Sequence, residues 1–299
     1  MKVFITGGTG FVGTHLSRFL LDRGHEVTAT GSSAAHRKIG HAHFKYVAAD
    51  TTQAGDWQEA LHNSDLVVNL AGRTIMKRWT ERYKKEIYDS RILTTRNVVQ
   101  AMPRNGSVTL CSASAVGYYG DRGDEFLSED AAPGDGFLAE IGRAWESEAL
   151  EAEAAGVRVA LMRFGVVLGK GGGAMQKMIP AFRTYMGGPM GDGTQWFPFI
   201  HIEDVSGAIL HIAENPGLSG PFNFTAPHPV RNKDMAATLG KVLRVPAVMK
   251  TPKFMLRLAL GEVGITLTES QRVLPDKLLK SGYTFSYPDI EAAVQQIVQ

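Results

Sequence analysis

The sequence of 299 residues contains a single cysteine, Cys111. One thiol cannot form a disulfide within the chain, and a zinc site built from several cysteines is excluded as well. A dominant charge is also missing, because 32 Lys and Arg residues stand against 30 Asp and Glu residues. The pI of 8.6 therefore reflects a near balance, and it does not favour a nucleic-acid-binding protein.

Long apolar runs are absent too. No stretch approaches the roughly 18 apolar residues that a membrane-spanning helix requires, and no charged-then-apolar leader precedes the first predicted strand. The nine histidines show no ligand pair at helical spacing, and His41 with His43 lies in a short polar segment typical of solvated side chains. We expect a cytoplasmic protein without a metal site, a membrane contact or a nucleic-acid partner.

A glycine-rich turn stands at the start of the chain. An apolar run at residues 3–5 breaks into Gly7, Gly10 and Gly13, after which a helical apolar pattern begins. The first glycine permits a sharp reversal, the second lets the backbone approach a diphosphate, and the third lets the helix lie close to the strand. The unpaired amides at the start of the helix then face the phosphates. We predict dinucleotide contacts from Gly7, Gly10, Phe11, Val12 and Gly13.

Three spaced glycines alone are a weak signal, and a purely structural turn is the alternative interpretation. The chain that follows favours the dinucleotide site, because strands and helices continue to alternate. Strands are predicted at residues 26–30, 44–49, 65–72, 107–111 and 157–163, and helices at residues 81–102 and 136–155. This alternation predicts a parallel, doubly wound sheet.

The end of the second strand bears on the choice of cofactor. No Asp or Glu occurs between residues 28 and 40, whereas Ser32 and Arg37 do. An acidic residue here would bind the ribose 2′-hydroxyl of NAD, while Arg and hydroxyl side chains accommodate the 2′-phosphate of NADP. The segment favours NADP, with NAD as the alternative, unless its basic residues are simply solvated. Later strand ends add predicted contacts at Asp50, beside the adenine, and at Leu70, Ala71 and Gly72.

The composition changes from residue 165 onward. The glycine-rich stretch 165–173 lies too far from a strand-to-helix junction for a second phosphate turn and predicts a flexible excursion. A strand is expected at 222–224, and helices at 178–186, 203–214, 232–243, 252–261, 267–280 and 290–298. The predicted class is α/β, a Rossmann doubly wound parallel sheet with a smaller C-terminal α+β substrate lobe. We assign residues 1–165 to the NAD(P)-binding domain, with its sheet completed by later segments around 200–225, and residues 166–299 to the interleaved lobe.

Seven motifs spread over the chain carry a resemblance to a known family. They are GGTGFVG (7–13), NLAG (69–72), SASAVGYYG (112–120), GDGFLAEIGRAWE (134–146), RFGVVLG (163–169), GDGTQWFPFIHIEDV (191–205) and SQRVLPDKLLKSGYTFSYPD (270–289). The chain resembles the atypical extended short-chain dehydrogenases/reductases, and within them the "epimerase family" of nucleoside-diphosphate-sugar epimerase-like proteins, some described as cell-division inhibitors. The resemblance implies a Rossmann domain with bound NADP(H), and it adds Arg91 and Ser112 to the predicted cofactor contacts.

The catalytic pattern of that superfamily is not complete here. Ordinary members carry a Tyr four residues before a Lys on one helix, which places both side chains on the same face. The matching positions are Leu138 and Gly142, neither of which can transfer a proton. No Tyr in the sequence is followed by Lys at that spacing, and the nearest imitation is Tyr118 with Arg122. The usual helix Asn is replaced by Arg91, so that only the upstream serine survives.

Two functional hypotheses remain open. In the first, the chain is an NADP-dependent oxidoreductase or epimerase acting on an unknown small molecule through a relocated acid or base. The candidate catalytic residues are Ser114, Tyr118 and Tyr119, with Glu140 as a weaker one, and the candidate substrate contacts are Gln195, Trp196 and His201. Each of these side chains also has a purely structural interpretation. In the second, the protein binds NADP(H) without catalysis, as a sensor or interaction protein with an apolar surface patch on its C-terminal lobe. Either monomer or homodimer fits the sequence.

Overall fold

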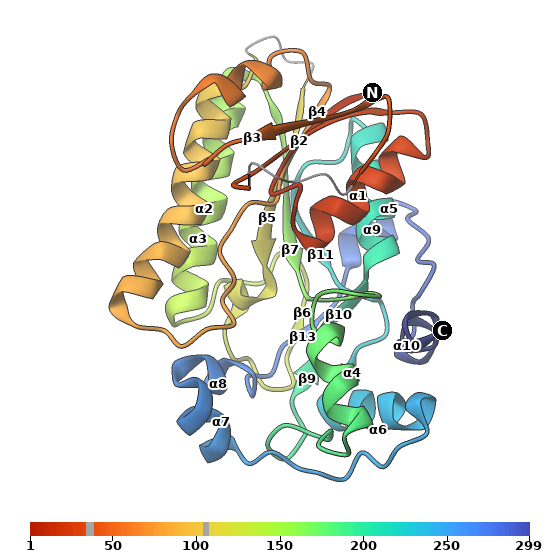
Figure 1. Ribbon diagram of the computed structural model, residues 1–299. Helices are drawn as coiled ribbons and strands as arrows, with labels where there is room; N and C mark the ends of the chain where they lie inside the picture. Colours follow the sequence, from red (N-terminus) through yellow and green to blue (C-terminus); the bar gives the residue numbers. More distant parts are fainter. Residues whose placement is uncertain (34–38, 104–107) are drawn as a thin grey trace.

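The computed structural model describes residues 1–33, 39–103 and 108–299 (Figure 1). Its central sheet has seven strands, which are β1 (Lys2–Thr6), β2 (Glu26–Gly31), β3 (Phe44–Ala48), β4 (Leu66–Asn69), β5 (Thr109–Ala115), β7 (Arg158–Phe164) and β11 (Gly220–Phe224). All neighbours are parallel, in the order β11-β7-β5-β4-β1-β2-β3. The predicted parallel, doubly wound sheet is confirmed.

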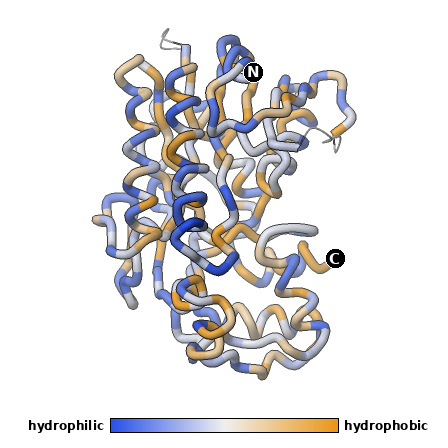
Figure 2. Tube along the Cα trace, turned by 60° about the vertical axis from the view of Figure 1, so that its left-hand side comes forward, coloured by the Kyte–Doolittle hydropathy of each residue, from blue (hydrophilic) through white to orange (hydrophobic). Residues whose placement is uncertain are grey.

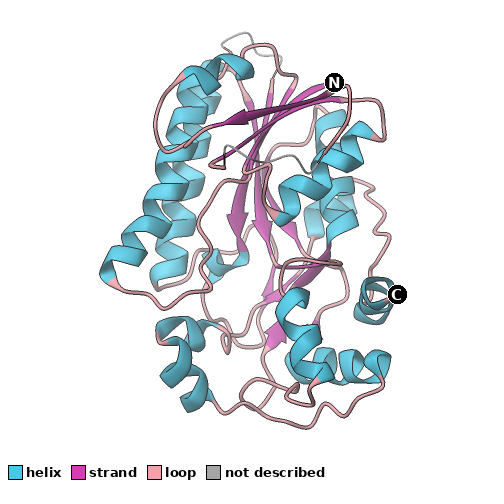
Figure 3. Ribbon diagram, viewed as in Figure 1, coloured by secondary structure: helices cyan, strands magenta, loops and turns pink. Residues whose placement is uncertain are grey.

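Helices cover both faces of this sheet, as Figure 3 shows. One face carries α1 (Phe11–Leu21), α5 (Ile202–Glu214) and α9 (Asp276–Lys280), and the other carries α2 (Glu81–Ala101), α3 (Phe137–Leu150) and the 3-10 segments η1 (Asp56–Leu61) and η3 (Glu151–Ala155). Side chains of β1 alternate between the two layers: Val3 and Ile5 join the core under α1, and Phe4 stacks on Trp57 in the other core. Burial on both faces explains the consecutive apolar residues of the central strands β1 and β4.

A smaller lobe lies beyond the carboxyl edge of the sheet. Its helices are α4 (Met175–Arg183), α6 (Asn232–Leu243), α7 (Lys253–Leu260), α8 (Glu262–Thr266) and α10 (Ile290–Val298). Short paired strands accompany them, β8 (Val166–Leu168) with β10 (Phe199–His201), β9 (Trp196–Phe197) with β12 (Val230–Arg231), and β6 (Phe126–Leu127) with β13 (Arg272–Val273). The lobe has its own core, in which Phe199, Leu239 and Val294 are fully buried.

Hydrophobic and hydrophilic residues alternate along the helical traces (Figure 2), as amphipathic helices that cover a sheet require. Within the described ranges, no helix is both long and apolar enough to cross a membrane. The seventh strand of the sheet, β11, comes from beyond residue 165. The domain boundary at that residue stays a prediction.

Two sequence expectations in the C-terminal half are wrong. The single helix predicted at 267–280 is replaced by β13 and the short helix α9, because Pro275 cannot donate a helical hydrogen bond and the chain before it pairs with β6. The glycine-rich stretch 165–173 is not a flexible excursion. It contains β8, and Gly169, Gly172 and Gly173 pack against the ring of Phe11 at the start of α1.

Candidate functional site

The turn between β1 and α1 leaves no room for side chains. A Cβ on Gly7 would lie 2.9 Å from the Ala71 nitrogen, and one on Gly13 would lie 2.5 Å from the Gly7 carbonyl oxygen. Gly7 also has a φ of +66°, which glycine adopts without strain. The backbone of this turn is therefore held close to the loop after β4, as the sequence predicts.

The amides at the start of α1 are open. The Thr14 amide donates to the Gly10 carbonyl at 2.9 Å, so the amides of Phe11, Val12 and Gly13 precede the helical hydrogen bonds. No side chain caps the helix at Gly10, and its first turn holds no acidic residue. These three amides can donate hydrogen bonds to a phosphate or diphosphate, and the positive end of the helix dipole attracts its negative charge.

Thr6 joins this turn to the end of β4. Its hydroxyl donates to Oδ1 of Asn69 at 2.7 Å and accepts from the amides of Leu70 and Ala71 at 3.0 and 3.2 Å. The ends of β1 and β4 are therefore fixed side by side at the carboxyl edge, where open α/β sheets bind their ligands. The structure brings Leu70, Ala71 and Gly72 together with the glycine turn, and their contact with a cofactor remains a prediction.

The structure describes part of the region where the sequence predicts the adenosine half of the cofactor to bind. Ser32 is exposed directly after β2, whereas Arg37 lies outside the described residues. The Ala49 amide donates to the Gly31 carbonyl at 2.9 Å, which places Asp50 beside the tip of β2. Oδ1 of Asp50 accepts from the amide and the hydroxyl of Thr52. Asp50 therefore lies where the sequence predicts the adenine pocket.

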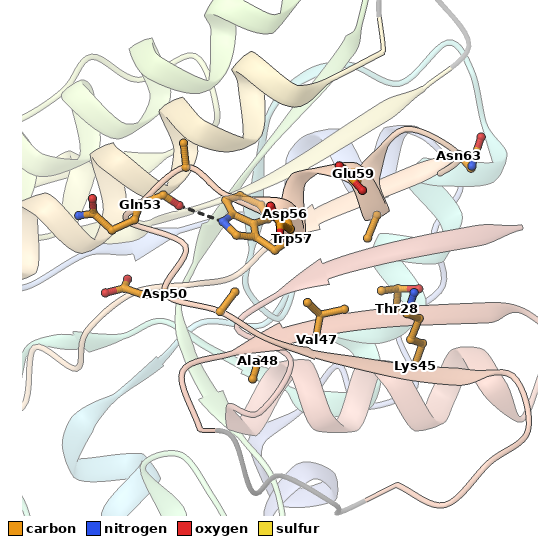
Figure 4. A pocket seen from close by; sticks show the side chains of 13 residues that line it. Thr28, Lys45, Val47, Ala48, Asp50, Gln53, Asp56, Trp57, Glu59 and Asn63 are labelled. Atoms are coloured by element: carbon orange, nitrogen blue, oxygen red, sulfur yellow. Dashed lines mark hydrogen bonds between the residues drawn. The ribbon is translucent and has the colours of Figure 1, made fainter.

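A groove of about 870 Å³ lies next to Asp50, between η1 and the outer strands β2 and β3 (Figure 4). Lys45, Val47 and Trp57 line it, and Nε1 of Trp57 donates to the Gln53 carbonyl at 2.9 Å. Most of these residues lie on one face of the sheet, away from the carboxyl edge. Among the predicted dinucleotide contacts that the structure describes, Asp50 lines this groove.

The structure places Ser112 in the core, and its contact with a cofactor stays a prediction. It is fully buried, with a relative exposure of 0%. Its Oγ accepts from Nδ2 of Asn69 at 3.2 Å, and that same nitrogen donates to Thr95 on α2. Through Asn69, Ser112 therefore helps to link β4, β5 and α2 inside the core. It lies three residues before the end of β5, and so behind the carboxyl edge of the sheet.

A buried ion pair joins Glu146 on α3 to Arg163 near the end of β7. Nε of Arg163 donates to Oε1 of Glu146 at 2.8 Å, and Nη2 donates to Oε2 at 2.8 Å. The side chains are 4% and 7% exposed. Burial lowers the pKa of Arg163, but hydrogen bonds and charge interactions with Glu146 and Tyr119 outweigh it and leave that pKa above its ordinary value. The sequence signal for this pair is a cation in an otherwise apolar strand, since a buried charge needs a partner.

Ser114 and Tyr119 belong to this network. Oγ of Ser114 donates to Oε1 of Glu146 at 2.7 Å, so its proton is already committed. The Tyr119 hydroxyl accepts from Nη1 of Arg163 at 2.9 Å and donates to Oδ1 of Asn223 at 2.7 Å. Burial raises the pKa of Tyr119 to about 12. With 0% exposure, Tyr119 does not line a crevice, and this burial favours a structural role over the predicted role as an acid.

Tyr118 has different surroundings, although it shares the segment η2 (Val116–Tyr119) with Tyr119. Its ring is half-buried and lies under the Arg163 guanidinium, whose Cζ is 3.8 Å from the ring centroid. A Cβ on Gly142 would lie 3.3 Å from Cα and Cβ of Tyr118. Tyr118 thus covers the helix position at which ordinary family members carry lysine. Glu140, by contrast, is exposed on α3 and lines a different hollow together with residues of α2 and α8.

The three predicted substrate contacts lie in separate environments. Nε2 of Gln195 donates to the Met190 carbonyl at 3.1 Å, and its Oε1 is buried without a partner in the part of the chain that the structure describes. Nε1 of Trp196 donates to Oδ1 of Asp124 at 2.7 Å, and its half-buried ring lies against Arg231 and Arg272. Gln195 therefore lies beside residues 190 and 267 of the lobe, whereas Trp196 lies against Asp124.

His201 lies inside the fold, and its contact with a substrate stays a prediction. It is fully buried, its Nδ1 accepts from the Glu203 amide at the start of α5, and its Nε2 is 3.0 Å from Oε1 of Gln296. Burial lowers the pKa of His201, which favours the neutral ring. This histidine caps a helix because it ends β10, and it does not face a crevice.

Glu269 is a titratable residue that sequence reasoning did not identify. Burial raises the pKa of this half-buried carboxyl to about 7, and the neighbouring charge of Asp121 adds to the effect. The folded protein therefore keeps this proton above pH 4.5, where the unfolded chain has lost it. Stability from this group is present at low pH and falls as the pH rises from about 4.5 to about 7.

We expect Glu269→Gln to remove this dependence of the free energy of unfolding on pH. Because the side chain is partly solvated, the gain in the free energy of unfolding above pH 7 should be on the order of 1 kcal/mol. Urea unfolding of wild type and Glu269→Gln at pH 5 and pH 8 measures it, with the exposed Glu140→Gln as the control. A variant that loses stability equally at both pH values would show that the carboxyl is not destabilised by ionisation.

In the described ranges, no three His, Cys, Asp or Glu residues gather in a group that could hold a metal ion. The candidate site has three parts. The glycine turn of residues 7–13, here called the glycine cradle, lies beside the end of β4. The buried Glu146–Arg163 pair lies at the ends of β5 and β7, and Tyr118 lies over Gly142.

Known proteins of similar sequence and structure match the whole chain. Residues 3–223 match the NAD-dependent epimerase/dehydratase family, and residues 251–297 match a domain of unknown function, DUF1731. The epimerase family protein YfhF of Bacillus subtilis is 40% identical over 100% of this chain and 98% of its own length. The chloroplastic epimerase family SDR39U1 homologue of Arabidopsis thaliana is 39% identical over 100% of this chain and 87% of its own length.

A solved structure agrees with these sequences. The human epimerase family protein SDR39U1 (isoform 2), crystallised with NADPH, superposes with a TM-score of 0.85 and 34% identity, and the match covers 99% of each chain. The motifs, the sheet order and the comparisons all agree, and the chain belongs to the NAD-dependent epimerase/dehydratase family.

Proposed function

We propose that this protein binds NADP(H) along the carboxyl edge of its sheet and exchanges hydride with a small, sugar-like carbonyl or hydroxyl substrate. The observation that carries the proposal is the cradle in which Gly7 and Gly13 have no space for a Cβ while the amides of residues 11–13 stay open. The human relative with NADPH supports the choice of nucleotide. Bound nicotinamide supplies the hydride donor or acceptor, and the chain supplies binding, orientation and the proton.

The sheet order supports one direction for the bound cofactor. β1 lies between β2 and β4, so a diphosphate held at the start of α1 has Ser32 and Asp50 on one side and Gly72 on the other. The adenosine belongs with the tips of β2 and β3, and the nicotinamide half then crosses the end of β4 toward β5. Ser114 and Tyr118 follow on β5 and η2, which supports a reaction on that side.

Hydride transfer to a carbonyl carbon requires a proton for its oxygen. Tyr118 is our candidate for that proton, because its half-buried ring is held by Arg163 and the backbone of α3, and its hydroxyl makes no hydrogen bond to a described residue. Ser114 contributes indirectly, since its proton is engaged by Glu146. The pair Glu146–Arg163 fixes the guanidinium on which the Tyr118 ring rests.

We expect Tyr118→Phe to reduce kcat by about 100-fold or more, as the loss of a general acid does, while the Kd for NADPH changes less than about twofold. The reason is that only the hydroxyl is removed, and the ring still packs against Arg163. Single-turnover kinetics and NADPH fluorescence measure the two quantities. Tyr119→Phe is the matched control, because it removes a buried structural hydroxyl from the adjacent residue. Equal turnover losses in both variants would contradict the assignment.

The proposal as a whole is tested by titrating the purified protein with NADPH and NADH and then screening it against carbonyl compounds and nucleotide sugars. We expect NADPH to bind more tightly than NADH and to be oxidised, or the sugar to be epimerised, with at least one compound class. An empty site at saturating concentrations of both nucleotides would refute it.

A second candidate function, NADP(H) binding without turnover by an interaction protein, is favoured by one observation. Large apolar side chains are exposed along α7 and the preceding loop, with Val248 at 76%, Phe254 at 70% and Leu258 at 78%. Exposed apolar groups of this kind often mark interaction surfaces. Robust NADPH oxidation in the same screen would remove this candidate, whereas tight binding without any turnover would favour it.

A further inference from the structure

Helix α7 carries apolar side chains on two faces. On one face Leu256 is buried and Leu260 packs against the core around Val263, so this face anchors the helix to the protein. On the other face Phe254 and Leu258 lie one turn apart and are 70% and 78% exposed. A surface helix usually carries polar residues on its outer face. The outward apolar face of α7 is therefore not explained by the core of the lobe.

A second exposed segment lies beside this helix. The Thr251 amide donates to the Pro189 carbonyl at 3.0 Å, and the Gly191 amide donates to the Thr251 carbonyl at 2.8 Å. These bonds join the loop before α7 to the loop after α4, in which Tyr185 and Met186 are 61% and 62% exposed. Figure 1 shows α7 and the chain that leads to it at the end of the molecule farthest from the N-terminus. The exposed apolar side chains of this end, here called the apolar tip, are Tyr185, Met186, Val248, Met249, Phe254 and Leu258.

Tyr185 is exposed in spite of its local conformational preference. Its φ is +60°, in the left-handed region that bulky residues rarely adopt. Helices commonly end on a residue in this conformation, and that residue is usually Gly or Asn. The end of α4 therefore places an aromatic ring on the surface at a position where a smaller residue would cost less.

The charges around the apolar tip have one sign. Residues 244–260 contain four Lys and Arg residues and no Asp or Glu. Lys253 and Arg257 each directly precede one of the exposed apolar residues of α7, and within the described ranges neither forms an ion pair. Hydrogen bonds from Thr194 lower the pKa of Asp192, and the charge of Lys253 adds to this effect. Asp192 is, however, engaged by the amide and hydroxyl of Thr194, so the cations of α7 stay available to an external anion.

This combination is typical of segments that lie at the surface of an anionic membrane. Apolar side chains enter the boundary between headgroups and acyl chains, while Lys and Arg meet the lipid phosphates. The apolar tip combines one face of a short helix with two loops. A fluid bilayer surface accommodates such an irregular set of side chains, whereas a helix-binding groove of a protein requires anchors at regular helical spacing. The observations therefore favour lipid over a protein partner.

We propose that the apolar tip inserts into the surface of a membrane that contains anionic lipids, with Phe254 and Leu258 below the headgroups and Lys253 and Arg257 at the lipid phosphates. The inference goes beyond the proposed function and does not depend on a bound cofactor. The absence of a long apolar run, on which the expectation of no membrane contact rests, excludes a spanning helix and not an interfacial one.

The first experiment sediments the full-length protein with vesicles of phosphatidylcholine mixed with phosphatidylglycerol and with vesicles of phosphatidylcholine alone. We expect wild type to bind the mixed vesicles and to bind them less at high salt. The double variant Phe254→Ser with Leu258→Ser should lose about tenfold or more of this binding, because two apolar side chains are removed from the interface. The double variant Lys253→Gln with Arg257→Gln should also lose about tenfold or more, since each cation near an anionic surface contributes about fivefold.

Matched controls lie elsewhere on the surface. Arg82→Gln with Lys85→Gln removes the same charge from exposed positions of α2, and Leu279→Ser removes an apolar side chain that is 46% exposed on α9. Both should bind the mixed vesicles like wild type. Thermal unfolding of each variant reports on folding.

The second experiment locates the contact on the protein. Cys111 is the single cysteine and is fully buried, so a cysteine placed on the surface takes a dye selectively. A solvatochromic dye on Leu258→Cys should shift to the blue with the mixed vesicles, and the same dye on Leu279→Cys should not. Equal shifts at both positions, or binding that survives the loss of Phe254 and Leu258, would indicate non-specific charge attraction and overturn the inference.

Two further outcomes would also overturn it. One is that wild type binds neither kind of vesicle. The other is a dimer in light scattering that the double variant Phe254→Ser with Leu258→Ser abolishes, which would assign the apolar tip to a contact between copies of this chain.

Discussion

We expect Glu146→Ala to lower the free energy of unfolding by about 3–5 kcal/mol, because the buried charge of Arg163 would lose its carboxylate partner. Glu146 accepts both donors of the Arg163 fork and the Ser114 hydroxyl. Without it, Arg163 would keep its charge at 4% exposure, with only the Tyr119 hydroxyl and the Glu129 carbonyl as acceptors. Urea unfolding at neutral pH measures the loss.

The matched control for that measurement is Glu148→Ala. Glu148 lies on the same helix and also forms a two-point contact, with Nε and Nη2 of Arg96 at 3.1 and 2.8 Å. Arg96 is 48% exposed, and exposed pairs contribute at most about 1 kcal/mol. Comparable losses in the two variants would show that the Glu146–Arg163 pair is not the buried anchor of this edge of the sheet.

We expect Gly13→Ala to weaken NADPH binding by about 100-fold, or about 2.7 kcal/mol, and to destabilise the fold. Its Cβ would lie 2.5 Å from the Gly7 carbonyl oxygen and 2.7 Å from Cα of Gly8. Helix α1 would have to move away from β1, and with it the open amides of residues 11–13. NADPH titration and thermal unfolding of the same preparation measure both effects.

Gly10→Ala separates the two effects. At Gly10 a Cβ would approach only the Gly7 carbonyl oxygen, at 3.2 Å, and would otherwise point to the exposed side, where the diphosphate is proposed to lie. This variant should lose affinity with little change in stability. Gly217→Ala, in a loop where a Cβ meets nothing within 4 Å, should alter neither. Wild-type affinity in Gly13→Ala and Gly10→Ala would place the dinucleotide elsewhere.

The cofactor edge could be predicted from the sequence because its signals are local. The turn at residues 7–13 is written in seven consecutive residues, and Leu70 to Gly72 directly follow an apolar strand. The apolar periodicity of strands and helices likewise depends on neighbouring residues. Most of the strands and helices predicted from the sequence therefore lie within a few positions of those in the structure. The helix expected at 267–280 failed where a proline and a non-local strand pairing outweighed the helical pattern.

The catalytic side depends on contacts between distant residues. Tyr118 and Tyr119 are neighbours of the same type, yet one lies over Gly142 and the other is bonded to Asn223, 104 positions away. Similarly, His201 meets Gln296 through the fold of the C-terminal helix. Nothing in the adjacent sequence distinguishes a phenol that is buried by such partners from one that remains available. Arg163 was the one detectable clue, as a charge within an apolar strand.

The strands leave the ribosome in a different order from the one in which they lie in the sheet. β7 is complete by residue 164, but its outer neighbour β11 begins at residue 220. During synthesis the backbone groups along that side of β7 have no strand to pair with until more than fifty further residues have been added, and an unpaired edge invites association with other chains. A nascent chain stalled in this interval would be a natural client for chaperones that shield strand edges.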